Sequence, residues 1–85
     1  MDSFEAFKEK LDQEHKWPDM YVFKFVVPVG KATEFKTAFQ HEAFQEKKSK
    51  AGNYISFTLK KRLQSSDEVV EMYLQAQKID GIIAL

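Results

Sequence analysis

The side chains of this chain that could suggest catalysis or metal binding are two histidines and a few serines. The chain has no cysteine. His15 and His41 lie in separate predicted elements, and neither has a second histidine at the spacing of a zinc site. The serines have no histidine nearby in the sequence that could act as their base. The three glycines are too far apart to form a phosphate-binding loop. We therefore expect no catalytic residue, no metal and no cofactor, and a protein that is not an enzyme.

Basic residues gather around the segment Ser49–Tyr54, where the sequence predicts a tight turn between two strands. Residues 46–64 contain six bases and one acid, whereas the whole chain has a formal net charge of zero. Such a segment can bind an anionic partner. Lysines on a strand edge also discourage aggregation, which is an explanation that needs no ligand. The candidate interaction surface consists of Lys47, Lys48, Lys50, Asn53, Tyr54, Lys60 and Arg62.

The same segment partly resembles the third-strand octamer of the RNA-recognition motif. Lys50 stands at its basic position and Tyr54 at one of its stacking positions. Gly52, however, stands where a second stacking aromatic is needed, and the first predicted strand offers no outward ring for a base. Weak binding of single-stranded RNA is therefore an alternative function, and nucleic acid is not the expected partner.

The periodicity of apolar residues predicts three helices and four strands. Asp2 and Glu5, and later Ser65 and Glu68, have the spacing of helix capping boxes. Trp17 ends the first helix, because the residue before a proline is pushed out of the helical region. We expect helices over residues 3–14, 31–40 and 66–77, strands over 21–27 and 54–63, an edge strand over 42–50, and a last strand over 79–85.

The order of these elements predicts the α+β class. After the first helix, the order is strand, helix, strand, strand, helix, strand. Right-handed crossovers convert this order into a ferredoxin-like βαββαβ sandwich, a four-stranded antiparallel sheet with two helices on one face. We expect residues 1–15 to form an N-terminal helical extension and residues 16–85 to form the domain. The inner face should be filled by Phe23, Phe25, Phe35, Phe39, Phe57 and Tyr73.

The opposite face of the predicted sheet carries an apolar patch of Val22, Val26 and Tyr54, which a monomer would usually cover. One explanation is that the apolar stripe of the first helix folds over the patch. The other is a homodimer in which two sheets or two edges meet, with ligand or partner recognition at the seam. The sequence leaves both open. The stripe consists of Phe4, Phe7 and Leu11.

Composition points to a cytoplasmic protein without a membrane partner. Charged residues interrupt every apolar run near the start, so no secretory signal is expected. No apolar run approaches the about 20 residues that a membrane-spanning helix needs. The lack of cysteine is compatible with a reducing compartment.

Several motifs together resemble the YbeD-like family of uncharacterised small bacterial proteins. They are Trp17-Pro18 ahead of the strand, the hairpin segment Ser49–Ser56, Tyr73 after Glu68-Val69, and Ile79-Asp80. The resemblance covers roughly residues 16–85. It implies a small cytoplasmic protein with a ferredoxin-like fold similar to the regulatory ACT domain, a suggested link to lipoate metabolism, and no known catalytic residues.

The leading hypothesis is a non-enzymatic regulatory or interaction module that self-associates and binds a partner protein or a small metabolite. Its basis is the resemblance together with the lack of a catalytic constellation and the half-apolar outer face.

Overall fold

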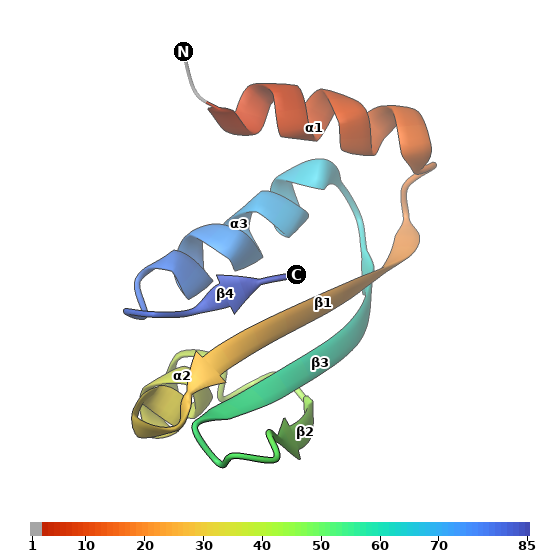
Figure 1. Ribbon diagram of the computed structural model, residues 1–85. Helices are drawn as coiled ribbons and strands as arrows, with labels where there is room; N and C mark the ends of the chain where they lie inside the picture. Colours follow the sequence, from red (N-terminus) through yellow and green to blue (C-terminus); the bar gives the residue numbers. More distant parts are fainter. Residues whose placement is uncertain (1–2) are drawn as a thin grey trace.

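The computed structural model describes residues 3–85. It contains a four-stranded sheet with its helices on one side (Figure 1). The strands follow the order β2-β3-β1-β4, and each neighbouring pair is antiparallel. This architecture confirms the predicted α+β class and the antiparallel sheet. In chain order the elements are α1 (Ser3–Glu14), β1 (Asp19–Pro28), the 3-10 turn η1 (Val29–Lys31), α2 (Ala32–Ala38), β2 (Gln45–Lys48), β3 (Tyr54–Leu63), α3 (Ser66–Gln77) and β4 (Ile83–Ala84).

The inner face of the sheet is filled by phenylalanine rings. Phe23, Phe25 and Phe35 are fully buried, and Phe35 stacks on Phe57 at a centroid distance of 4.3 Å. Each buried ring contributes about 2 kcal/mol through the apolar surface that it removes from water. The predicted inner set is confirmed, with Tyr73 half-buried at its edge.

The β2–β3 hairpin forms where the sequence predicts it. Gly52 has φ of +78°, a conformation that glycine adopts without a steric cost. The Ser49 amide donates to the Tyr54 carbonyl at 2.8 Å, and the Tyr54 amide donates to the Ser49 hydroxyl at 3.2 Å. These bonds close the turn and fix the register of the two strands.

Two predicted strands are shorter than expected. The edge strand begins only at Gln45, because a turn in which the Glu42 amide donates to the Phe39 carbonyl precedes it. The last strand, expected over 79–85, contains only Ile83–Ala84. Ile79 is buried in the core directly after α3, so the chain must turn before it can pair with β1.

Helix α1 lies on α3 and extends the helical layer, as Figure 1 shows. Leu11 is buried in the core, and the Phe7 ring meets the Tyr73 ring edge-on at 5.8 Å. The Lys8 ammonium also lies 2.6 Å from the Asp67 carboxylate of α3. Of the two explanations that the sequence left open for the outer apolar patch, the one in which the stripe of this helix covers it is therefore wrong. Leu11 of the stripe belongs to the core, and Phe7 packs against it.

The two predicted capping boxes have different outcomes. Asp2 lies outside the described residues, so the first box is not assessed. In the second, the Ser65 hydroxyl accepts from the Glu68 amide at 3.4 Å. The Glu68 carboxylate accepts from the Gln64 amide at 2.6 Å, where the expected donor was Ser65. The box thus fixes the start of α3 with its return bond displaced by one residue.

Candidate functional site

The side of the sheet that faces away from the helices is uncovered by any helix of the described chain (Figure 1). Successive side chains of a strand point to opposite faces, so every second residue of β1, β2 and β3 lies on this side. We call it the outer face. Its strand residues are Met20, Val22, Lys24, Val26, Gln45, Lys47, Tyr54, Ser56, Thr58, Lys60, Arg62 and Ile83.

The outer face is basic. Lys24, Lys47, Lys60 and Arg62 are all exposed there, and its strand positions include no acid. None of the four takes part in an ion pair with another described residue. Asp19, on the other side of the sheet, interacts electrostatically with Arg62 without forming an ion pair with it. Four bases on one face with no acid among its strand positions create a positive potential over the sheet.

Two charged residues on the helix side of the same strands, Glu46 and Lys61, are paired instead. The Lys36 ammonium lies 2.8 Å from the Glu46 carboxylate, and the Lys61 ammonium lies 2.5 Å from the Glu42 carboxylate. Glu46 of β2 and Lys61 of β3 thus have ion-pair partners on the helix side, whereas Lys24, Lys47, Lys60 and Arg62 of the outer face have no such partner among the described residues.

Apolar side chains separate the bases of the outer face. Val22 and Ile83 are about half exposed, and Tyr54 is 44% exposed. The face therefore offers apolar contact area as well as charge, which suits a macromolecular partner better than a free inorganic ion.

A shallow hollow of about 330 Å³ lies on the outer face beside the hairpin. Tyr54, Lys24 of β1 and the lysines of the hairpin surround it, so an anionic group placed there would meet several ammonium groups. We call it the hairpin hollow. It is lined by Lys24, Val26, Lys47, Lys48, Ser49, Lys50, Tyr54, Ser56 and Leu85.

The structure divides the predicted interaction surface into two groups, with Asn53 outside both. Lys47, Lys48, Lys50 and Tyr54 come together at the hairpin hollow. Asn53 is exposed at the end of the sheet, where its carbonyl accepts from the Val29 amide at 2.9 Å.

The second group lies farther along β3. Lys60 and Arg62 are on the outer face, but six residues of strand separate Lys60 from Tyr54, about 20 Å. Lys24, an outward residue of the first strand by alternation, was not included in the predicted interaction surface. Its pairing with Thr58 brings it between the two groups, and only the register of β1 against β3 reveals that position.

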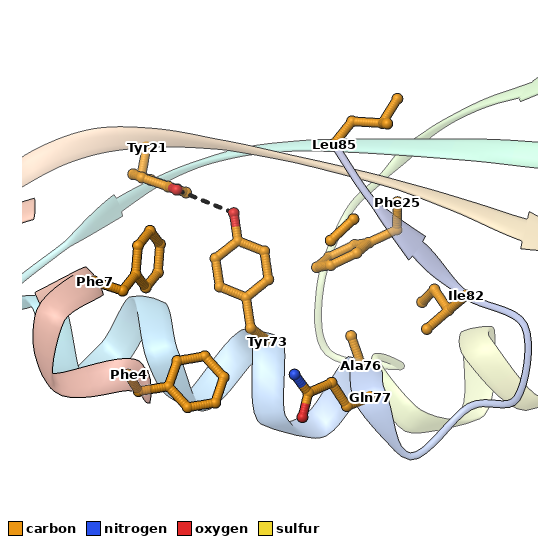
Figure 2. A pocket seen from close by; sticks show the side chains of 10 residues that line it. Phe4, Phe7, Tyr21, Phe25, Tyr73, Ala76, Gln77, Ile82 and Leu85 are labelled. Atoms are coloured by element: carbon orange, nitrogen blue, oxygen red, sulfur yellow. Dashed lines mark hydrogen bonds between the residues drawn. The ribbon is translucent and has the colours of Figure 1, made fainter. Parts of the chain in front are cut away.

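An apolar groove of about 560 Å³ lies on the helix side, between α1, α3, β1 and the last residues of the chain. Figure 2 shows Phe7 and Tyr21 at one end and Ile82 at the other, with Tyr73 between them. The sequence did not predict this groove. We call it the apolar groove, and it is lined by Phe4, Phe7, Tyr21, Phe25, Tyr73, Ala76, Gln77, Ile82, Ala84 and Leu85.

Two phenol groups form the polar part of the apolar groove. The Tyr21 and Tyr73 hydroxyl oxygens lie 3.0 Å apart, at hydrogen-bond distance. Burial, with a smaller effect of the bond to Tyr21, raises the pKa of the Tyr73 phenol well above its ordinary value. Tyr73 therefore stays neutral at physiological pH and acts as a hydrogen-bonding group within an apolar wall.

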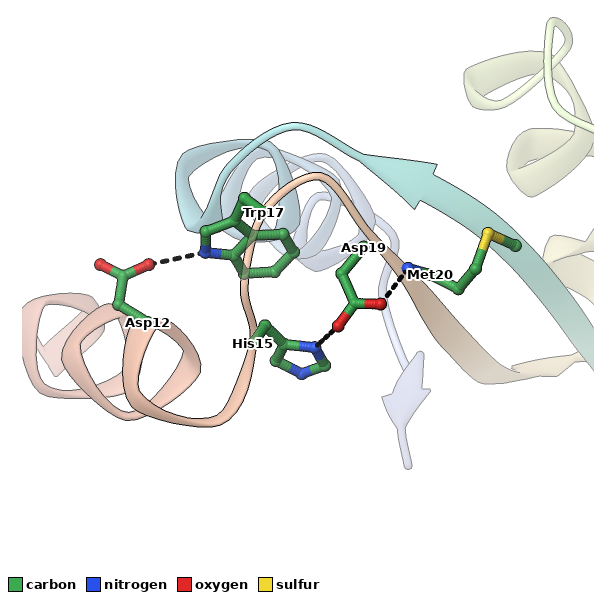
Figure 3. A network of polar contacts seen from close by, with 5 residues as sticks. All are labelled: Asp12, His15, Trp17, Asp19 and Met20. Atoms are coloured by element: carbon green, nitrogen blue, oxygen red, sulfur yellow. Dashed lines mark hydrogen bonds and ion pairs between the residues drawn. The ribbon is translucent and has the colours of Figure 1, made fainter.

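His15 belongs to a network that joins α1 to β1 (Figure 3). Its Nδ1 lies 2.7 Å from the Asp19 carboxylate, and its ring stacks on Trp17 at 5.0 Å. The Trp17 indole in turn donates to the Asp12 carboxylate at 2.8 Å. Hydrogen bonds from His15 and then from the Met20 amide hold the pKa of Asp19 below its ordinary value. These contacts explain His15 as a structural residue at the end of α1.

Within residues 3–85, no group of three or more histidine, cysteine, aspartate or glutamate side chains is arranged to hold a metal ion. None of the described helices has the length and hydropathy to cross a membrane.

The chain belongs to a family described as "Protein of unknown function (DUF493)", which it matches over residues 12–85. The match includes the whole sheet, α2, α3 and the last residues of α1. The part of α1 that contributes Phe4 and Phe7 to the apolar groove precedes it. No curated protein and no solved structure matches the chain.

Proposed function

We propose that this protein is a non-catalytic binding module that recognises an acidic segment of a partner protein through the outer face of its sheet. The observation that carries the proposal is the set of unpaired bases on a sheet face that no described helix covers. Because the bases alternate with exposed apolar side chains, the partner is expected to combine acidic and apolar residues.

The finer fold assignment is part of this proposal. The strand order β2-β3-β1-β4 with α2 and α3 on one side supports a ferredoxin-like sandwich. Membership in an uncharacterised family is consistent with the resemblance to the YbeD-like proteins. The likeness to the regulatory ACT domain is what that resemblance implies. A bacterial origin, a cytoplasmic location and the lack of enzymatic activity stay predictions from the sequence.

We favour a partner protein over a second copy of the chain on the outer face. Two copies meeting face to face would bring Lys24, Lys60 and Arg62 of each protomer close to the same bases of the other. Like charges brought together at an interface oppose association. Sedimentation at micromolar concentration and physiological salt should therefore give a monomer, whereas a stable dimer would support the homodimer that the sequence also allowed.

Binding of poly-L-glutamate, measured by calorimetry at low and physiological salt, tests the proposed function. The double variant Lys47→Glu, Arg62→Glu reverses two charges of the outer face, and its affinity should fall by at least about tenfold. The matched control Lys10→Glu, Lys78→Glu makes the same change in net charge at exposed sites away from this face. An equal loss of affinity in the two variants would contradict the proposal.

Binding of single-stranded RNA is the second candidate function. It is favoured by the exposed Tyr54 ring beside the lysines of the hairpin hollow. It predicts that oligouridylate binds with a steep dependence on salt, and that Tyr54→Ala weakens binding further, by about 1–3 kcal/mol for one lost stacking contact. No retention of oligouridylate at low salt would exclude this function.

A further inference from the structure

Strand β1 has an unpaired edge over half of its length. On one side it pairs with β3 along all of Asp19–Pro28. On the other side β4 pairs only with Phe25 and Val26, and the Leu85 amide adds a bond to the Lys24 carbonyl at 2.9 Å. No strand of the described chain lies against this edge of β1 before Lys24. We call residues 19–23 on this side the open edge.

The bond from Leu85 shows which backbone groups point to the open edge. Since the Lys24 carbonyl faces β4, the groups of Val22 and Met20 face the same way, because alternate residues of a strand direct their backbone groups to the same side. The Met20 amide is already bound by the Asp19 carboxylate at 2.8 Å. The Val22 amide and carbonyl are therefore the central donor and acceptor of the open edge, and Val22 is 54% exposed.

The apolar groove runs along the open edge on the helix side. Tyr21, which lies on this edge, also lines the groove, together with Phe7 of α1 and Tyr73 of α3 (Figure 2). A strand added to the open edge would direct every second side chain toward these rings. The apolar groove has a volume of about 560 Å³, which is within the range of small-ligand sites and accommodates more than one apolar side chain.

The other side chains of an added strand would face the bases of the outer face. Val22 is directly opposite Lys60 in the sheet register, and Met20 is opposite Arg62. An added strand would lie next to Val22 and Met20, within reach of these long basic side chains and of Lys24. Acidic residues at the outward positions would therefore find their counter-charges.

From these four observations we propose that the partner binds as an extended peptide that adds an antiparallel strand to β1 beyond Leu85. Its inward side chains are apolar and enter the apolar groove, and its outward side chains are acidic and meet Lys60 and Arg62. Backbone bonds to Val22 supply affinity, and the alternating side chains supply specificity. This inference rests on the proposed function and specifies how the acidic segment is recognised.

The test uses a blocked peptide of about seven alternating glutamate and valine residues, enough to cover the open edge. In antiparallel pairing, residues directly opposite each other point to the same face, so the glutamates lie opposite Val22 and Met20 and direct their amides to β1. N-methylation of the glutamates should weaken binding by at least about tenfold, the loss expected when a backbone bond is replaced by a clash. N-methylation of the valines, whose amides point to solvent, should change the affinity less than about twofold.

A second measurement follows the protein itself. Exchange of the Val22 amide hydrogen should slow by at least about tenfold when the peptide is bound, because the amide becomes bonded. Val22→Pro removes this donor at an edge position where proline is tolerated, and it should abolish binding, whereas the control Val22→Thr keeps the donor and the affinity.

The outcomes separate this inference from the proposed function. If both N-methylated peptides bind as well as the parent, the peptide lies on the outer face without strand addition; the inference is then overturned and the proposed function stands. Equal weakening by both methylations, or no change in Val22 exchange, also overturns the strand addition. If neither the peptide nor poly-L-glutamate binds, both proposals are overturned.

Discussion

The phenol oxygens of Tyr21 and Tyr73 lie 3.0 Å apart and connect the first strand of the sheet to the last helix. The Tyr73 ring also contacts the Phe7 ring at 5.8 Å and the Phe23 ring at 5.4 Å. One residue of α3 therefore links α1, β1 and the core.

Tyr73→Phe should lower the free energy of unfolding by about 1 kcal/mol. The substitution keeps the ring contacts but removes one member of a hydrogen-bonded pair, whose net contribution is of that size. Urea unfolding at pH 7 measures the difference. A variant with unchanged stability would show that the hydrogen bond between the two hydroxyls is no more favourable than their hydrogen bonds to water.

The same pair should make stability depend on alkaline pH. Since burial raises the pKa of Tyr73 in the folded state, the contribution is fully present below the ordinary phenol pKa of 10.0 and is lost as pH rises from there toward the folded pKa. The stability of the wild-type protein should then fall above pH 10 more steeply than that of Tyr73→Phe. Parallel curves for the two proteins would contradict the assignment.

At acidic pH, Asp19 should also make stability depend on pH, but its stabilising contribution is lost as pH falls. Hydrogen bonds from His15 and from the Met20 amide lower its folded pKa, so its contribution is present above the ordinary value of 3.8 and is lost as pH falls through the folded pKa. The stability difference between the wild type and Asp19→Asn should shrink below pH 3.8. A titration of the Asp19 carboxyl by NMR that gives an unshifted midpoint would disprove the network in solution.

Phe35→Ala should be among the most destabilising substitutions, at about 3–5 kcal/mol. Phe35 is fully buried and contacts the rings of Phe25, Phe39 and Phe57, so its removal leaves a cavity between α2 and the sheet. Val22→Ala on the exposed outer face is the control and should cost less than about 0.5 kcal/mol. Similar losses in the two variants would mean that the core is not centred on Phe35.

Ser65→Ala should lower stability by about 1 kcal/mol through loss of the cap of α3. The Ser65 hydroxyl accepts from the Glu68 amide, which has no partner within the first turn of the helix. Ser65→Asp retains an acceptor and should restore most of the loss. If the aspartate variant is as unstable as the alanine variant, the cap is not the source of the effect.

Local signals in the sequence predicted most of the fold. Alternation in residues 21–27 identified the inward rings, and Gly52 located the hairpin, because strand period and turn chemistry act over a few residues. The end of α1 before Pro18 followed from a local steric rule as well. These features need no knowledge of the rest of the chain.

Features that depend on distant contacts were not predicted. The docking of α1 on α3 depends on Phe7 meeting Tyr73, which are far apart in the sequence. The last strand is short because burial of Ile79 takes precedence over strand propensity. The candidate site was found only in part for the same reason. Strand alternation places Lys24 on the outward side, but its position between the two basic groups, like the apolar groove, arises from pairing between distant segments.

An NMR titration of the protein with poly-L-glutamate tests the central claim most directly, because it maps the binding surface residue by residue. The account predicts that amide shifts concentrate in β1, β2 and β3, at Lys24, Lys47, Lys60 and Arg62 and their neighbours, and vanish at high salt. Shifts concentrated in α2 or on the outer side of α1, with the strands unchanged, would contradict it.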